Sequence, residues 1–352
     1  MAMTRGTCRW PKRPNPSDRG KRGMDMALQR RTILGAGFGM VGSTLLLAGA
    51  AGAQTAAAHA DAAQPVGLPD SGTHLLLLGT MAGPVLDPSR MMASQAVIVD
   101  GAVYLVDCGY GTILRMIEAG LRPADVKAIF VTHHHSDHNA DYANLVHLAW
   151  IQGIEDRIVS IGPPPFQAIH DAALAFHHED IRIRIEGTGR KPIEGYFEVR
   201  EVTEPGLVYE DDKIRVTAAI ATHPPFSTAL GFRFETPDRS IVFSGDTVAS
   251  EQITALAEGA DVLVHEAMYV PGIDAMLAKR PYVPPKLRDF LMDGHTTAED
   301  AGRIAAQAGV ATLVLTHLLP GDQPQVTDEI WAAEAAKEFD GRIVVGHDLL
   351  LL

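Results

Sequence analysis

Cysteine is scarce in this sequence of 352 residues, which contains only two. Cys8 lies in a basic N-terminal stretch that we expect to be removed, so no intramolecular disulfide is expected in the mature chain. The other, Cys108, follows the apolar run that starts at Val103, and we expect it to be a small buried apolar residue. Linker-like stretches are also missing between His74 and Leu352. Because 46% of the chain is hydrophobic, these residues can form one domain with a sizeable core.

Positive charge is scarce outside the N-terminus. The whole chain has a formal net charge of −13. Its first 31 residues hold nine Lys and Arg against two acidic residues, so they contribute +7 and the remainder carries −20. Such a surface repels polyanions. No cluster of Lys and Arg with interleaved aromatic residues is present either. We therefore do not expect nucleic acid among the partners of this protein.

Charged residues are missing altogether from residues 32–59. This run is rich in Gly and Ala, follows the pair Arg30-Arg31, and closes on small residues at Ala51-Gly52-Ala53 and Ala58-His59-Ala60. It resembles a twin-arginine export signal. We predict that residues 1–60 are a removed leader and that the mature protein is periplasmic or secreted without a stable membrane anchor. An uncleaved membrane anchor is the alternative.

Short apolar runs alternate with helical patterns over the rest of the chain. Strands are predicted at residues 75–78, 96–99, 103–106, 128–132, 158–161, 213–221, 231–235, 240–244, 262–265, 312–316 and 342–345. Helices are predicted at residues 142–150, 164–176, 250–258, 297–308 and 327–339. A front half rich in hairpins and a back half of alternating strands and helices predict two packed sheets with helices outside, an αββα sandwich within the α/β class. We assign it to one domain at residues 61–352.

Candidate metal ligands follow the ends of several predicted strands. The stretch Val131 to Asp141, VTHHHSDHNAD, contains the pattern H-x-H-x-D-H, with two histidines on one side of an extended chain. Strand ends are the usual location for sites in α/β sheets. Ordinary polar loop residues would be the alternative, but the same position recurs along the chain. The candidates are His133, His135, Asp137, His138, His223, Asp246 and His317.

These motifs resemble the metallo-β-lactamase superfamily, and within it the branch of ribonuclease Z, zinc phosphodiesterases and arylsulfatases. The resemblance runs from Leu75 to Val345 and includes His265-Glu266-Ala267 and Gly294-His295-Thr296-Thr297. It implies that His133, His135 and His223 hold one metal ion, that Asp137, His138 and His317 hold a second, and that Asp246 bridges them. Imidazole and carboxylate ligands suit two Zn²⁺ ions per chain, with Mn²⁺ or Fe²⁺ as alternatives. A homodimer is also implied.

The resemblance further implies the catalytic residues. A metal-bridging hydroxide would attack phosphorus or sulfur with Asp137 orienting it, and His295, held by Glu266, would stabilise the developing charge or protonate the leaving oxygen. A supporting or capping pair is the alternative for His295 and Glu266.

The expected substrate is a small ester. Enzymes that trim tRNA 3′ ends carry an RNA-gripping arm between the residues equivalent to His223 and Asp246, which here lie only 23 positions apart. We therefore predict an exported dinuclear zinc hydrolase of small phosphodiester or sulfate (aryl) esters. A ribonuclease Z-like 3′-tRNA processing endonuclease and a non-catalytic metal-bound binding protein are the alternatives. Residues 268–293 read as a long ordered loop that walls or covers the site as a lid, with a dimer contact or plain surface packing as the alternative.

Overall fold

The computed structural model describes residues 67–280 and 282–352 of the chain. The predicted leader at residues 1–60 lies outside this part, and it remains a prediction. Within the described residues, no helix combines the length and the hydropathy that crossing a membrane requires. All of the described residues belong to one compact unit.

Two mixed sheets form the centre of this unit. The first has the spatial order β1-β2-β3-β4-β5-β6, antiparallel from β1 to β3 and parallel from β3 to β6. Its strands are β1 (Thr73–Gly79), β2 (Ser94–Val99), β3 (Ala102–Val106), β4 (Val126–Phe130), β5 (Ile158–Gly162) and β6 (Phe197–Glu201). Asp100 and Gly101 both have positive φ and join β2 to β3 in a tight hairpin.

The second sheet has the order β13-β12-β11-β10-β9-β8-β7, antiparallel from β7 to β10 and parallel from β10 to β13. Its strands are β7 (Gly206–Glu210), β8 (Arg215–Ala221), β9 (Ala229–Glu235), β10 (Ser240–Phe243), β11 (Val262–Met268), β12 (Thr312–Leu319) and β13 (Arg342–Val345). The short interval between His223 and Asp246 contains only the β9–β10 hairpin, as the sequence predicts.

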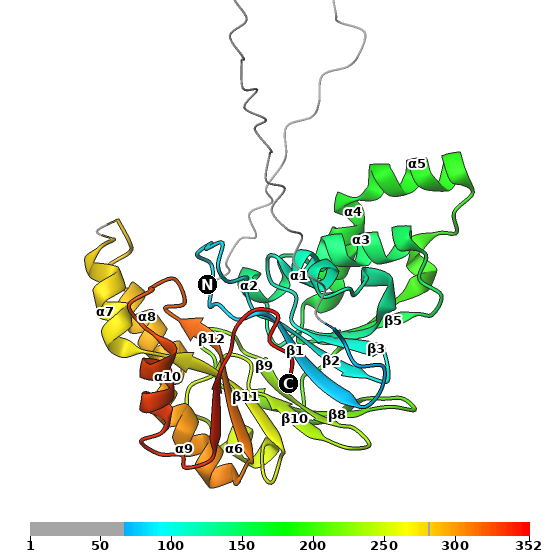
Figure 1. Cartoon of the computed structure of the whole chain (residues 1–352). Helices are drawn as coiled ribbons and strands as arrows, with labels where there is room; N and C mark the ends of the chain where they lie inside the picture. Colours follow the sequence, from blue (N-terminus) through cyan, green and yellow to red (C-terminus); the bar gives the residue numbers. More distant parts are fainter. Residues whose placement is uncertain (1–66, 281) are drawn as a thin grey trace, which may run out of the picture. The chain divides into compact units, whose positions relative to one another are not determined.

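Helices cover the outer faces of both sheets (Figure 1). The first group packs on the sheet of β1 to β6 and comprises α1 (Thr112–Glu118), α2 (Ser136–Asn139), α3 (Tyr142–Gln152), α4 (Phe166–Phe176) and α5 (His178–Thr188). The second group belongs to the other sheet and comprises α6 (Glu251–Leu256), α7 (Val270–Ala278), α8 (Leu287–Gly294), α9 (Ala298–Ala308) and α10 (Asp328–Ala335). The short helices η2 (Pro123–Asp125) and η3 (Ile193–Tyr196) complete the first half.

Three apolar layers hold the sandwich together. The middle layer joins the two sheets, and in it the ring of Phe130 from β4 lies edge-on against Phe232 and Phe234 from β9, with centroids 5.4 and 5.0 Å apart. One outer layer packs α1, α3 and α4 on the first sheet, and the other packs α9 and α10 on the second. Burial of apolar surface of this kind is the main stabilising contribution to such a fold. The αββα sandwich predicted from the sequence is confirmed.

The prediction that residues 268–293 form a long loop is wrong. This segment contains α7 and α8, which pack in one apolar cluster with Ala82 and Leu319, α7 through Ile273 and Met276 and α8 through Leu291 and Met292. Of the three prolines that suggested a loop, Pro271 takes one of the first positions of α7 and costs no backbone hydrogen bond, while Pro284 and Pro285 precede α8.

Candidate metal and catalytic site

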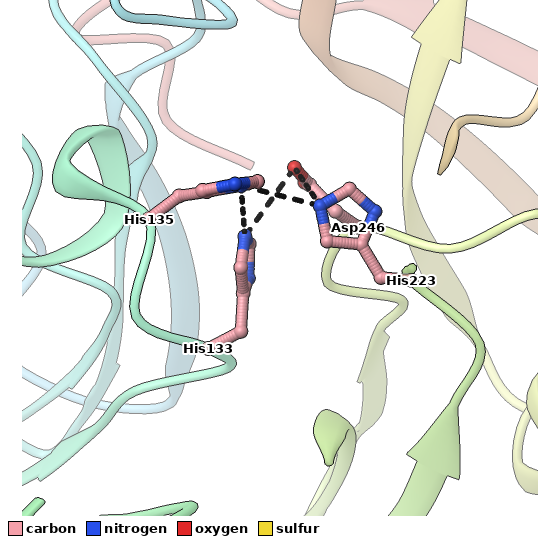
Figure 2. A group of neighbouring side chains, drawn as sticks. All are labelled: His133, His135, His223 and Asp246. Carbon is pink, nitrogen blue, oxygen red and sulfur yellow. Dashed lines mark hydrogen bonds and ion pairs between the residues drawn. The ribbon is translucent and has the colours of Figure 1, made fainter. Parts of the chain in front are cut away.

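The first predicted ligand group converges from both sheets. His133 and His135 follow β4, His223 follows β8, and Asp246 follows β10 (Figure 2). The ligand atoms of these four side chains all lie within 4.8 Å of one another. The Nδ1 atom of His135 lies 3.1 Å from Nε2 of His133 and 3.2 Å from Nε2 of His223. The structure therefore brings together the three histidines that the sequence assigns to one metal ion.

The second predicted group lies beside the first. Asp137 and His138 belong to α2, and His317 lies near the end of β12 with a positive φ of 44°. Nε2 of His317 lies 3.3 Å from Oδ2 of Asp137 and 3.2 Å from Nε2 of His138. All three side chains are buried. Their ligand atoms also lie within 4.8 Å of one another.

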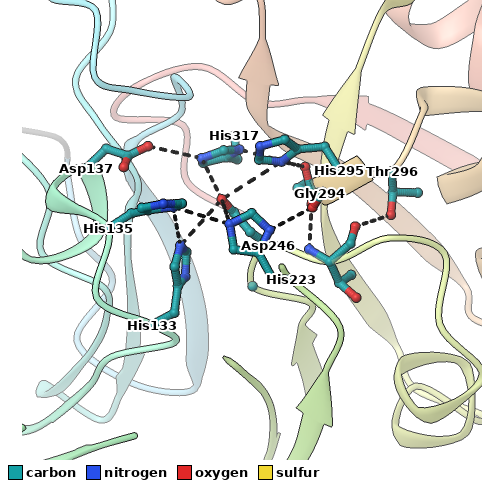
Figure 3. Close-up of polar contacts among 12 residues, drawn as sticks. His133, His135, Asp137, His223, Asp246, Gly294, His295, Thr296 and His317 are labelled. Carbon is teal, nitrogen blue, oxygen red and sulfur yellow. Dashed lines mark hydrogen bonds and ion pairs between the residues drawn. The ribbon is translucent and has the colours of Figure 1, made fainter. Parts of the chain in front are cut away.

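Asp246 lies between the two groups (Figure 3). Its Oδ2 atom is 3.3 Å from Nε2 of both His138 and His317 and 3.7 Å from Nε2 of His133. Its Oδ1 atom is buried and has no hydrogen-bond partner among the described residues. Burial alone would raise the pKa of this carboxyl, but the imidazoles of His317 and His138 outweigh burial and hold the pKa well below its usual range. Asp246 is therefore an ionised carboxylate in contact with both groups.

The nitrogen atoms of these groups suit bound cations. His138 donates from Nδ1 to Oδ2 of Asp107 at 2.7 Å, and His223 donates from Nδ1 to the carbonyl oxygen of Gly294 at 2.7 Å. In neutral rings, these bonds leave the lone pair on Nε2 directed into the cluster. Burial lowers the pKa of His223 to about 4, so this ring is neutral at pH 7. Lone pairs that face one another across about 3 Å, beside an unpartnered carboxylate oxygen, fit metal ions rather than hydrogen bonds.

The predicted catalytic pair lies at the edge of the same cluster. Nδ1 of His295, which follows α8, donates to Oε2 of Glu266 on β11 at 2.7 Å. Burial alone would lower the pKa of His295, but the carboxylates of Glu266 and Asp246 outweigh burial and raise it to about 9. These two carboxylates favour the protonated form of His295, and its Nε2 atom makes no bond to Glu266. The ligand atoms of His295, Glu266, His317 and Asp246 also lie within 4.8 Å of one another. This geometry would allow His295 and Glu266 to hold a metal ion as well.

Two residues that the sequence analysis did not single out complete the site. Asp107, one residue beyond β3, is buried and orients both His138 and Thr132, whose backbone N–H donates to Oδ1 of Asp107 at 2.8 Å. Gly83 donates its backbone N–H to Oδ2 of Asp137 at 2.7 Å. A Cβ atom at Gly83 would lie 2.2 Å from Cβ of Asp137, so only glycine permits this approach. Asp107 directly follows a predicted strand, so the expectation that functional residues lie at strand ends applies to it as well. No local sequence pattern indicates Gly83.

A cavity of about 220 Å³ opens onto both groups of ligand-type residues. On one side it is lined by His135, Asp137, Asp246, His295 and His317. Its other side is apolar and comes mainly from α8, through Leu287, Phe290 and Leu291. The segment predicted as a lid or plain surface thus contributes a wall of the site.

Comparison with known proteins identifies the family. Residues 91–317 match the Metallo-beta-lactamase superfamily. The chain belongs to the metallo-β-lactamase superfamily. Its homologues include proteins named Ribonuclease Z: the one from Mycobacterium sp. (strain KMS) is 38% identical over 280 residues, covering 78% of this chain and 93% of the relative. The one from Mycobacterium bovis (strain BCG / Pasteur 1173P2) is 34% identical over 278 residues, covering 78% and 96%.

Solved structures of the superfamily share the fold. The metallo-β-lactamase fold protein YhfI from Bacillus subtilis superposes with a TM-score of 0.59 at 19% identity, covering 80% of this chain and 100% of that chain. The short form of human tRNase Z superposes with a TM-score of 0.59 at 21% identity, covering 79% and 98%. At these identities the comparison supports the αββα architecture alone.

Two predictions are contradicted by these relatives. The main functional prediction, an exported hydrolase of small phosphodiester or aryl sulfate esters, is wrong, because the homologues are ribonuclease Z proteins aligned over nearly their whole length. The expectation that nucleic acid is not a partner is wrong for the same reason. Both rested on the net charge of −20 and on the short interval before Asp246. Net charge describes the whole surface and not one cleft, and a short hairpin excludes one RNA-gripping arm without excluding other contacts with RNA.

Proposed function

We propose that this protein is a metal-dependent RNA phosphodiesterase of the ribonuclease Z type, which cuts 3′ extensions from tRNA precursors. The observation that carries the proposal is the arrangement of two His and Asp groups around one shared carboxylate, with the hydrogen-bonded pair of His295 and Glu266 beside them. The homologues named Ribonuclease Z support it.

We propose Zn²⁺ as the ion at both positions, since the donor set contains imidazole and carboxylate and no cysteine. His133, His135 and His223 would hold one ion, Asp137, His138 and His317 the other, and Asp246 would contact both. A pair of such ions supplies a nucleophile at neutral pH by lowering the pKa of water and neutralises charge on the phosphate.

Three side chains of this protein orient the water and supply the proton. Asp137, fixed by the N–H of Gly83, offers a carboxylate oxygen that orients the attacking water. His295 carries a proton on Nε2 and donates it to the oxygen that leaves the phosphorus. Glu266 keeps His295 protonated and fixes its ring through Nδ1. Removing a donor aimed at the developing charge typically costs about 10²–10³ in kcat.

The test is cleavage of a tRNA precursor with a 3′ extension by the purified full-length protein in the presence of Zn²⁺. We expect a single cut at the base of the extension, loss of turnover in Asp246→Ala, and a kcat lower by roughly 10²–10³ in His295→Gln. An intact precursor after incubation with protein of verified zinc content would contradict the proposal. Equal cleavage by Asp246→Ala would assign the activity to a contaminant.

A further inference from the structure

The apolar wall of the catalytic cavity contains an aromatic ring that packing does not account for. Phe290 is 42% exposed although it lies on a helix whose next residues, Leu291 and Met292, pack in an apolar cluster with Ile273 and Met276. Its ring lines the cavity and lies near His135, with ring centroids 6.4 Å apart. An apolar ring that stays exposed beside a catalytic centre offers its face to a ligand.

A basic residue stands at the N-cap of the same helix. Lys286 precedes Phe290 by four residues, and side chains at this spacing are neighbours on a helix surface. The two nearest basic residues are both engaged: Arg288 pairs with Asp274 at 2.7 Å and Arg280 pairs with Asp322. Lys286 is exposed, and no carboxylate of the described residues forms an ion pair with it. It is therefore available to a phosphate group.

The wall is a fixed part of the structure. Leu291 and Met292 attach α8 to α7 through the apolar cluster, and the Arg288–Asp274 ion pair joins the same two helices. The cavity, of about 220 Å³, has the candidate catalytic groups on its polar side and residues of α8 on its apolar side. A nucleotide placed there must be unpaired, because a paired base would bring its partner strand into the same space.

We propose that Phe290 and Lys286 form a nucleotide subsite, in which an unpaired nucleobase next to the scissile phosphate stacks on Phe290 and a neighbouring phosphate contacts Lys286. This subsite rests on the proposed RNA phosphodiesterase function and deepens it: the substrate is single-stranded RNA at the cleavage point. It also provides an RNA contact that does not depend on an arm between His223 and Asp246. Binding through stacking and very few phosphate contacts is compatible with a strongly acidic surface.

The first experiment compares steady-state cleavage of a 3′-extended RNA by the native protein, Phe290→Ala and Phe290→Trp. Stacking of one base on an aromatic side chain corresponds to roughly 5- to 150-fold in affinity, so we expect KM to rise by that factor in Phe290→Ala with kcat within about twofold. Phe290→Trp should restore the native KM. The matched control is Phe176→Ala on α4, which removes a ring that is 79% exposed in the layer outside the first sheet and should change neither constant.

One further substrate and one salt series separate the contributions of the base and of the phosphate. An RNA with an abasic nucleotide beside the scissile phosphate should raise KM of the native protein as much as Phe290→Ala does, and combining the two changes should add little. Lys286→Ala should reduce the slope of log affinity against log salt by about 0.7, the value for one phosphate contact with a single strand. An unchanged KM in Phe290→Ala together with equal cleavage of the abasic RNA would overturn the subsite while leaving the proposed function intact.

A binding measurement covers the case in which turnover fails. A short RNA with 2-aminopurine at the predicted position is mixed with the full-length protein, and its fluorescence is recorded. Quenching that Phe290→Ala abolishes and Phe176→Ala retains would support the subsite even if no cleavage occurs, so that only the proposed catalytic function would fail. Absence of quenching with the native protein would refute the subsite.

Discussion

Asp107→Asn tests how far the carboxylate behind His138 determines metal binding. In the native protein the carboxylate accepts from Nδ1 of His138 at 2.7 Å, so that in the neutral ring, the form that binds a metal ion, the lone pair of Nε2 is directed toward Asp246 and His317. Asparagine keeps the size of the side chain, and its carbonyl oxygen can still accept from the N–H of Thr132. Its amide group would then face Nδ1 of His138 as a donor. The imidazole would have to move its proton to Nε2, where a metal ion needs the lone pair.

The expected cost is a 10- to 100-fold loss of metal affinity, which is the usual effect of removing a partner that orients a histidine ligand. This corresponds to about 1.4–2.8 kcal/mol at 25 °C. The assay is competition for Zn²⁺ with a fluorescent chelator. Asp141→Asn is the matched control, because Asp141 is also buried and accepts from the backbone N–H groups of Gly111 and Ile113. Equal zinc affinity in the Asp107 and Asp141 variants would refute the orienting role of Asp107.

Three further predictions follow from other parts of the structure. Gly83→Ala should lower kcat by roughly 10²-fold with little change in far-ultraviolet circular dichroism, because its Cβ would meet Asp137 and displace a catalytic side chain; a native kcat would contradict this. Burial and the bond to Asp211 raise the pKa of Tyr104 above the value near 10 expected in the unfolded chain, so its contribution to stability is full below about pH 10 and is lost above it by about 1.4 kcal/mol per pH unit. Urea unfolding between pH 8 and pH 11 should therefore show a shallower alkaline decline in Tyr104→Phe, and an equal decline would remove Tyr104 as the cause. If residues 1–60 are an exported leader, intact mass in cell fractions should show a mature chain beginning near the end of that leader outside the cytoplasm; a full-length chain confined to the cytoplasm would contradict the leader and favour access to tRNA precursors.

The site was predictable where one physical rule applied repeatedly. His133, His223 and Asp246 each follow a strand of a sheet, and functional side chains gather at such ends. Asp107 obeys the same rule, but its position inside an apolar run made it look like part of the core. Gly83 was not predictable, because its contact with Asp137 joins residues 54 positions apart and depends on how the two segments pack.

The missed elements have identifiable causes. β6 and β7 are short, carry charged or polar residues along much of their length, and lie at the edges of their sheets, so the apolar pattern of a buried strand is absent. α8 was read as a loop because of Pro284 and Pro285, although Leu287, Phe290 and Leu291 have the spacing of one helix face. That face lines the catalytic cavity. The two prolines were given more weight than the helical spacing of the apolar residues, so the wall that α8 contributes to the cavity was not predicted.

The most direct test of the account is the chemistry of the cut RNA ends. If water is the nucleophile, cleavage in H₂¹⁸O should place one ¹⁸O atom in the product phosphate, give no 2′,3′-cyclic phosphate, and disappear in Asp246→Ala and on removal of metal by a chelator. A 2′,3′-cyclic phosphate without solvent oxygen would show attack by the ribose hydroxyl of the RNA. Together with cleavage that persists in Asp246→Ala, this result would contradict a metal-dependent phosphodiesterase centred on Asp246.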